Sequence, residues 1–161
     1  MSLARQRITP QEYLALERAS EVRHEYFNGS VYAMAGAKER HNLVTSNVSG
    51  ELHARFKGRG CKVHSSDMRV KVDTTGLYTY PDVVALCGPA RFEDDEQDTL
   101  VNPALIVEVL SPPTEAYDRG EKFAHYRRIA SVTDYLLISP DRLRVEHSAA
   151  VRMTSHRIRG R

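Results

Sequence analysis

The sequence predicts an α/β fold in which a mixed β-sheet is flanked by helices, and three patterns indicate this class. Residues 24–34 alternate about Asn28-Gly29, the strongest short signal for a β-hairpin in the chain. Apolar residues at helical spacing predict a long helix from His41 to Phe56. The run that ends near Glu108, a helix and the apolar run 134–139 form a βαβ crossover, so these two strands should be parallel.

Length and composition are typical of one globular domain with one core. The chain has 161 residues, of which 41% are hydrophobic and 27% charged. No apolar run approaches the roughly 20 residues needed to span a bilayer. Residues 1–10 lack the apolar region of a secretory signal. We therefore expect no membrane partner and a cytoplasmic location.

The charge is mildly basic and unevenly distributed. The formal net charge of +2 is weaker than that of a dedicated nucleic-acid binder. After Ser139, however, arginines outnumber acids; they are Arg142, Arg144, Arg152, Arg157, Arg159 and Arg161. Residues 149–157 show neither helix nor strand periodicity. We therefore divide the chain into a domain, residues 1–147, and a basic, truncated or divergent tail, residues 148–161.

The first element is a predicted capped helix. Thr9 is the expected N-cap, Pro10 the first helical residue and Glu12 the partner in a capping box. Tyr13 and Leu16 are expected to face the core, and Leu14 is a further candidate.

In the hairpin that follows, Glu25 alternates with Phe27 and should be half-buried beside it. Two interpretations of Glu25 stay open. It is either a site acid or an edge carboxylate paired with Arg23 or Arg40.

The middle of the chain supplies the long helix and several strands. The apolar stripe of the helix comprises Leu43, Val44, Val48, Leu52 and Phe56. Gly58 and Gly60 end it. His41 in its first turn is either a site residue or a neutral partner of the helix cap. Residues 61–66 and 68–72 alternate as half-exposed strands.

Two further features of the middle region receive no function. Cys61 and Cys87 are far apart and lack a CxxC or His-rich partner, which favours two reduced, partly buried thiols over a zinc site or a disulfide. The acidic run 93–96 is expected to be an exposed, solvated loop without a catalytic role.

Two acids and a lysine carry the functional prediction. Asp82 opens one apolar run and Glu108 lies near the end of another, where a carboxylate is costly to desolvate unless a charge opposes it. On neighbouring strands the two would emerge at one site and, at about 4 Å, repel by roughly 4 kcal/mol. Mg²⁺ would relieve this repulsion and complete its shell with water and phosphate oxygens. Lys122 lies on the next predicted helix.

Other chemistries have little support in the sequence. The patterns GxGxxG, GxxxxGK[ST], GxSxG and HExxH are absent, which argues against nucleotide-cofactor, P-loop, serine-hydrolase and zincin functions. A glycosidase using Asp82 and Glu108 would leave Lys122 idle.

Longer motifs point to one family. They are Arg23-His24-Glu25-Tyr26, Ala33-Met34-Ala35-Gly36, Arg40-His41-Asn42, Ser65-Ser66-Asp67-Met68, Tyr80-Pro81-Asp82-Val83, Ile106-Val107-Glu108-Val109-Leu110-Ser111-Pro112 and Tyr117-Asp118-Arg119-Gly120-Glu121-Lys122. Over residues 9–147 the chain resembles the Uma-two family of restriction-endonuclease-like proteins, within the PD-(D/E)XK nuclease superfamily. The resemblance implies a restriction-endonuclease-like fold and a metal-dependent endonuclease that hydrolyses DNA phosphodiester bonds with Mg²⁺ or Mn²⁺.

The resemblance also assigns roles to residues. Asp82 and Glu108 would be metal ligands, and Glu25 would be a third acid around the metal. Position 110 is Leu, which breaks the usual Glu-x-Lys, so Lys122 would supply the lysine from the following helix. His41 matches the family's Arg-His-Asn and joins the catalytic set.

Two departures from the family keep other outcomes open. The broken Glu-x-Lys and the altered C-terminus motivate an alternative, in which the chain is a catalytically inactive nuclease-fold module that binds nucleic acid or a partner. An open sheet edge near the C-terminus would favour a homodimer.

Overall fold

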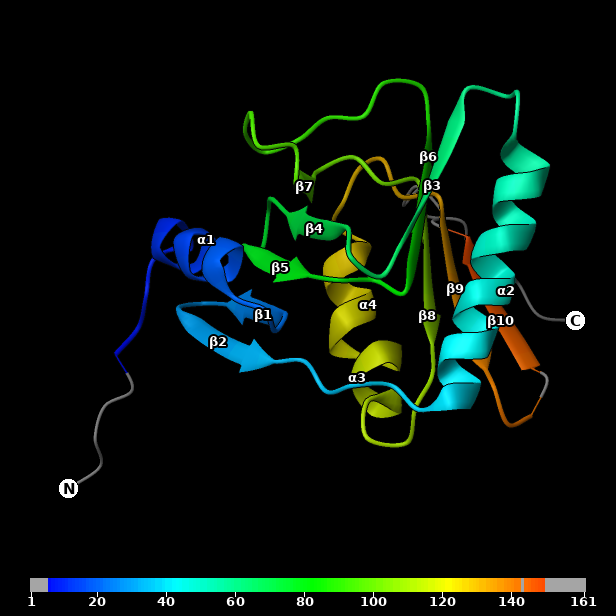
Figure 1. Cartoon of the computed structure of the whole chain (residues 1–161), viewed down its shortest axis with the longest axis horizontal. Helices are drawn as coiled ribbons and strands as arrows, with labels where there is room; N and C mark the ends of the chain where they lie inside the picture. Colours follow the sequence, from blue (N-terminus) through cyan, green and yellow to red (C-terminus); the bar gives the residue numbers. More distant parts are fainter. Residues whose placement is uncertain (1–5, 143, 150–161) are drawn as a thin grey trace, which may run out of the picture.

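The strands form two five-stranded mixed sheets in a computed structural model that describes residues 6–142 and 144–149 (Figure 1). The first sheet has the order β2-β1-β5-β4-β7 and contains β1 (His24–Phe27), β2 (Ser30–Ala33), β4 (Arg69–Val72), β5 (Leu77–Thr79) and β7 (Thr99–Leu100). The second has the order β10-β9-β8-β6-β3 and contains β3 (Cys61–Ser65), β6 (Val83–Cys87), β8 (Leu105–Val109), β9 (Asp134–Ser139) and β10 (Arg144–Ala149). The mixed α/β class is as predicted, but the strands divide between two sheets instead of one.

The predicted hairpin and crossover both form. β1 pairs antiparallel with β2 around Asn28, which has the positive φ that this turn requires. β8 pairs parallel with β9. The helix of the crossover is split at Gly120 into α3 (Glu115–Arg119) and α4 (Glu121–Tyr126). A side chain at Gly120 would approach the carbonyl oxygen of Ala116 to 3.2 Å, so glycine suits this bend.

One core joins the two sheets. It combines residues of the first sheet with residues of the second and with the crossover: Val70, Val72, Leu77, Leu100, Val84, Leu86, Ile106, Leu137, Tyr126, Ile129 and Val132. The helix α2 (Glu39–Phe56) and the α3–α4 pair lie on opposite sides of the second sheet (Figure 1).

The first helix, α1 (Pro10–Ala19), has the predicted capping box between Thr9 and Glu12. Tyr13 and Leu14 are buried as expected, whereas Leu16 is 46% exposed. The prediction for Leu16 was wrong because the buried stripe continues through Glu17 and leaves position 16 beside it. Glu17 is buried because its carboxylate accepts hydrogen bonds from the backbone N–H of His24 and from the Tyr80 hydroxyl.

The long helix α2 is also confirmed, but its buried stripe is narrower than predicted. Leu43 is 52% exposed, and Thr45 is buried instead. The helix packs chiefly against β3, the edge strand of the second sheet, and touches β6 and β8 less. Because α2 lies mostly over this edge strand, Leu43 falls outside the buried stripe of the helix.

The cysteines correct another prediction. Cys61 and Cys87 are partners in the antiparallel register of β3 and β6, and they form a disulfide. The sequence did not reveal this disulfide, because the two cysteines are 26 residues apart and only the register of the two strands makes them direct neighbours.

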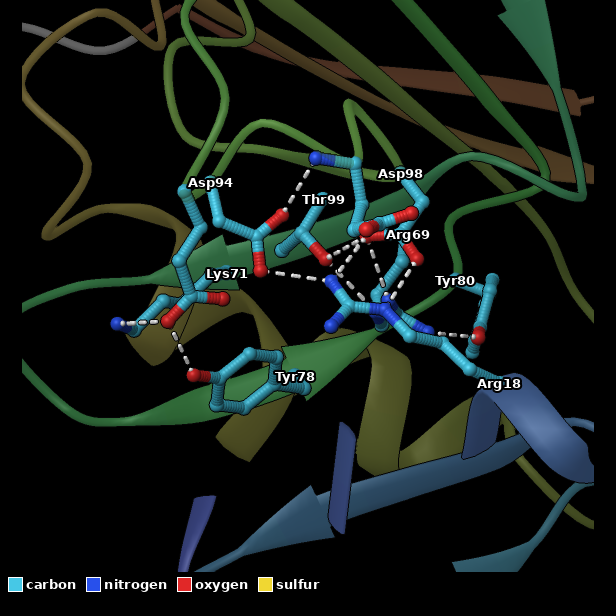
Figure 2. A network of polar contacts seen from close by, with 10 residues as sticks. Arg18, Arg69, Lys71, Tyr78, Tyr80, Asp94, Asp98 and Thr99 are labelled. Atoms are coloured by element: carbon cyan, nitrogen blue, oxygen red, sulfur yellow. Dashed lines mark hydrogen bonds and ion pairs between the residues drawn. The ribbon is translucent and has the colours of Figure 1, made fainter. Parts of the chain in front are cut away.

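The acidic loop is anchored rather than simply solvated, as Figure 2 shows. Arg18 of α1 bonds Asp94 at 2.7 Å and Asp98 at 2.8 Å. These contacts, with Arg69, hold the pKa of Asp98 well below its usual range. Glu93 accepts hydrogen bonds from Lys71 and from the Tyr78 hydroxyl, both at 2.6 Å. The loop therefore ties α1 to the first sheet.

The same network fixes the chain just before Asp82. The buried Arg69 donates to the Tyr80 hydroxyl at 2.9 Å (Figure 2). Tyr80 in turn donates to Glu17 at 2.9 Å. Because Tyr80 lies two residues before Asp82, this anchoring helps to determine where the Asp82 carboxylate emerges.

The last described element is β10, which continues two residues past the predicted domain boundary at 147. It forms an outer strand of the second sheet within the described residues. Residues 150–161 of the predicted basic tail lie outside the described part of the chain, and the homodimer stays a prediction. Among the described helices, none has the length and apolarity to cross a membrane.

Candidate active site

Asp82 and Glu108 converge at one site, as the sequence predicted. β6 and β8 are antiparallel neighbours, and the pairing of Val83 with Val107 places Asp82 across from Glu108. The backbone N–H of Val109 donates to Oδ2 of Asp82 at 2.7 Å. This hydrogen bond fixes the carboxylate at the point where β8 ends.

Glu108 is the deepest acid of the site. Its residue is 3% exposed, and its Oε1 accepts a hydrogen bond from the Tyr126 hydroxyl at 2.8 Å. Burial raises the pKa of Glu108 to about 8, and the negative charges of Asp82 and Asp118 act in the same direction. The attraction of Lys122 opposes this rise without cancelling it. A further positive charge in the site would therefore favour the ionised form of Glu108.

Lys122 reaches the inside of the site from α4, part of the helix on which the sequence placed it. The residue is 4% exposed. Its Nζ is 2.8 Å from Glu108 Oε1 and 3.5 Å from Glu25 Oε1. Burial lowers the pKa of this ammonium, but the surrounding carboxylates outweigh that effect and raise the pKa well above its usual value. Although position 110 is Leu, a lysine from α4 thus reaches Glu108.

Glu25 lies in the same pocket, and it is not paired with Arg23 or Arg40. Its Oε1 accepts from Thr79 Oγ1 at 2.6 Å, and its Oε2 from the Tyr117 hydroxyl at 3.4 Å. The arginines of the alternative interpretation pair elsewhere, Arg23 with Asp67 and Arg40 with Asp141. Glu25 therefore joins the first sheet to the site.

Asp118 is a site residue that the sequence analysis missed. It is 4% exposed, and its Oδ1 lies 3.6 Å from Lys122 Nζ. Its Oδ2 accepts from Thr114 Oγ1 at 3.0 Å. Burial raises its pKa. A signal was present, because an acid four residues before a lysine on a helix lies on the same face.

His41 reaches the site from the first turn of α2. Its Nε2 is 3.3 Å from Oδ2 of Asp82, and this contact raises the pKa of His41. Its Nδ1 is buried and has no hydrogen-bond partner among the described residues. The structure thus brings all five predicted site residues together: Glu25, His41, Asp82, Glu108 and Lys122.

These residues line one pocket of about 640 Å³. Its oxygen donors are hard carboxylates, which suit Mg²⁺ or Mn²⁺. Within residues 6–142 and 144–149, no hydrogen bond reaches Oδ1 of Asp82 or Oε2 of Glu108. No three metal-binding side chains of the described chain are already gathered in ligand geometry. The two uncontacted oxygens of Asp82 and Glu108 are thus the donors that would hold a divalent cation, and water or phosphate would have to supply its other ligands.

Comparison with known proteins now identifies the family. Residues 10–156 match the model of the Uma2 family, whose description is "Putative restriction endonuclease". The chain belongs to the Uma2 family. The resemblance inferred from the motifs around Asp82, Glu108 and Lys122 is therefore confirmed.

Relatives of this Uma2 family member agree with that assignment. Two uncharacterized proteins of Synechocystis sp. are 37% and 36% identical to it. Each match covers 87% of this chain, and the matches cover 73% and 79% of the respective relatives. A crystal structure of a "putative nuclease" from Anabaena variabilis superposes with a TM-score of 0.72 at 19% identity, over 89% of this chain and 80% of the other. This likeness confirms the restriction-endonuclease-like fold.

Proposed function

We propose that this Uma2 family member is a metal-dependent endonuclease that hydrolyses DNA phosphodiester bonds in the pocket built around Asp82 and Glu108. The observation that carries the proposal is the contact of 2.8 Å between Lys122 Nζ and Glu108 Oε1. It brings the lysine of the motif to the acid despite Leu110. The family description and the solved relative's name support the same reaction class.

Asp82 and Glu108 would hold Mg²⁺ or Mn²⁺ through their free oxygens, with Glu25 as a third acid nearby. When bound, such an ion lowers the pKa of a coordinated water and neutralises charge on the phosphate. This role fits the grouping of Glu25, Glu108 and Asp118 around Lys122 with Asp82 nearby, because a cation would favour the ionised form of Glu108, whose pKa is raised chiefly by burial and also by the charges of Asp82 and Asp118.

The protein's own residues would orient the reacting groups. Hydrolysis joins the oxygen of water to phosphorus and breaks one P–O ester bond. The Lys122 ammonium would stabilise the negative charge that develops on the phosphate oxygens. The Tyr126 hydroxyl and Asp118 would act as positioning groups, since the first holds Glu108 and the second holds Lys122.

His41 has a separate place in this proposal. It contacts Asp82 from the side of α2, opposite the residues of α3 and α4. From there, the imidazole would orient the Asp82 carboxylate.

The test is cleavage of supercoiled, linear and single-stranded DNA with Mg²⁺ or Mn²⁺, compared with the same reactions in EDTA. We expect cleavage by the wild type with either ion and none in EDTA. Lys122→Ala should abolish cleavage but retain metal binding under conditions in which circular dichroism shows the variant folded, because an ammonium does not ligate Mg²⁺. Cleavage that persists in EDTA or in Asp82→Asn would refute the proposal.

The inactive binding module remains the competing function, and the same assay separates the two. A binding module would bind DNA with wild-type affinity in Asp82→Ala and cleave under none of these conditions. The buried Lys122 makes this outcome the less favoured one, since a lost active site has no need to bury an ammonium among carboxylates.

A further inference from the structure

The acids of the site lie deep, which limits the shape of a substrate that can reach them. Glu108 is 3% exposed and Asp118 and Lys122 are each 4% exposed. A scissile phosphate must therefore enter the pocket, together with the sugars and bases attached to it. An unpaired strand is thinner and more flexible than a duplex, so it can follow the phosphate into the pocket more readily.

The walls of the pocket are largely apolar. Two segments line it, residues 33–37 from the end of β2 toward α2 and residues 110–113 between β8 and α3. Apart from Ser111 and Gly36, their side chains are apolar: Ala33, Met34, Ala35, Ala37, Leu110, Pro112 and Pro113. Sugar and phosphate groups are polar and would make few favourable contacts with such walls. The faces of unpaired bases would pack favourably against them, whereas stacking hides those faces in a duplex.

Tyr32 adds an aromatic surface at the entrance. It is 52% exposed and lines the pocket. In the register of the hairpin it is the direct cross-strand partner of Glu25, so both side chains lie on the same face of the first sheet. A base stacked on the Tyr32 ring would therefore sit beside the acid site.

Cations stand around the same entrance. Arg23, Lys38 and Arg40 line the pocket. Arg23 pairs with Asp67, whose side chain is 92% exposed, and Arg40 pairs with Asp141, with both side chains about two-thirds exposed. Exposed ion pairs of this kind contribute little stability. Phosphates that flank the scissile bond can replace these carboxylates as partners of the arginines.

We propose that the pocket selects single-stranded DNA over duplex DNA, with Tyr32 as the stacking platform for a base next to the scissile phosphate. This inference rests on the proposed nuclease function for the cleavage step. The binding preference itself does not depend on the nuclease function, because Tyr32, the apolar walls and the cations can contact DNA without a metal.

The experiment measures the affinity of the wild type for a labelled single strand of about 16 nucleotides, the upper end of site sizes for such grooves. The matched probe is the duplex of the same sequence, and EDTA prevents cleavage. We expect tighter binding of the single strand. Tyr32→Ala should weaken that binding by about 5- to 150-fold, the range for loss of one stacked base. Tyr32→Phe, which keeps the ring, should retain wild-type affinity.

Three results would overturn the inference: equal or tighter binding of the duplex, unchanged affinity in Tyr32→Ala, or no binding of either probe. Cleavage with Mg²⁺ then separates the two proposals. Cleavage of duplex in preference to single strand refutes the selection but leaves the nuclease function intact. Preferential binding of the single strand without cleavage of any DNA supports the selection and refutes the nuclease function.

Discussion

Replacing Lys122 with methionine should destabilise the protein strongly at neutral pH. The methionine keeps most of the buried stem but removes the charge that faces Glu108, Glu25 and Asp118. At 3.5 and 3.6 Å, the pairs of Lys122 with Glu25 and Asp118 each attract by about 5 kcal/mol at an effective dielectric of 20. Glu108, whose pKa is about 8, is mostly protonated at neutral pH, so its contact of 2.8 Å with Lys122 acts chiefly as a hydrogen bond. Desolvation of the four groups cancels most of this attraction. The cost of leaving a buried charge unpaired is about 3–5 kcal/mol in proteins.

A loss of that size is a large part of the total stability of a domain, which is about 5–15 kcal/mol. Urea denaturation of the wild type and Lys122→Met gives the difference in the free energy of unfolding. The matched control is Lys62→Met, because Lys62 is exposed on β3 and its replacement should leave stability unchanged.

Adding Glu25→Gln to Lys122→Met tests the cause of the loss. The glutamine removes one of the acids that Lys122 faces, so the double variant should recover part of the lost stability, by about 0.5–3 kcal/mol relative to additivity. A cost below about 1 kcal/mol for Lys122→Met, or strict additivity with Glu25→Gln, would refute the idea that the ammonium is held by these acids.

Three further predictions concern the scaffold. Thr9→Ala should lower the free energy of unfolding by about 1 kcal/mol, since it removes the N-cap hydrogen bond of α1. The control is Thr74→Ala in an exposed turn. Equal effects of the two substitutions would contradict the role of Thr9 as the N-cap. Reduction of the Cys61–Cys87 disulfide should cost about 3.5 kcal/mol, from the entropy of a closed loop with a sequence separation of 26. Cys61→Ser should lose this sensitivity to dithiothreitol, and a wild type insensitive to reduction would count against the bond. Arg18 and Arg69 hold the pKa of Asp98 well below its ordinary value of 3.8, so its contribution to stability is present above that pH and lost as the pH falls further. Asp98→Asn should therefore flatten the fall of stability at acid pH, whereas Asp95→Asn should not. Parallel curves for the wild type and Asp98→Asn would show that the pairing with Arg18 is ineffective.

Local sequence patterns predicted the elements well because their causes are local. Asn28-Gly29 demands a tight turn wherever it lies, and Thr9 with Glu12 caps a helix without help from the rest of the chain. The convergence of Asp82 and Glu108 was also predictable, since it needs only that their two strands be neighbours. The lysine of the site was found through the family motif, although its depth was underestimated.

The errors arose where distant segments decide the outcome. The register of β3 and β6 pairs Cys61 with Cys87, and no local pattern reveals a register. The exposure of Leu43 depends on how far α2 extends over the second sheet. Arg18 and Arg69 bind the acidic loop although they lie about 80 and 30 residues away in the sequence, respectively. The composition of the loop alone therefore predicted only an exposed, solvated segment.

Asp118 is the most instructive omission. The helical spacing to Lys122 was visible in the sequence, but a surface pair has the same spacing, and only burial distinguishes the two. Whether a polar side chain on a short helix faces a pocket depends on the sheet that the helix covers. Here the bend at Gly120 and the packing of Tyr126 turn both charges inward.

The central claim is that Asp82 and Glu108 converge to hold a divalent cation, and a calorimetric titration with Mn²⁺ tests it most directly. We predict saturable binding to the wild type and a loss of affinity of more than about tenfold in Asp82→Asn and in Glu108→Gln, a loss at least as large as that for an outer-shell partner of a metal ligand. Asp95→Asn, on the acidic loop, should bind like the wild type. Equal Mn²⁺ affinity in the wild type, Asp82→Asn and Glu108→Gln would contradict the account.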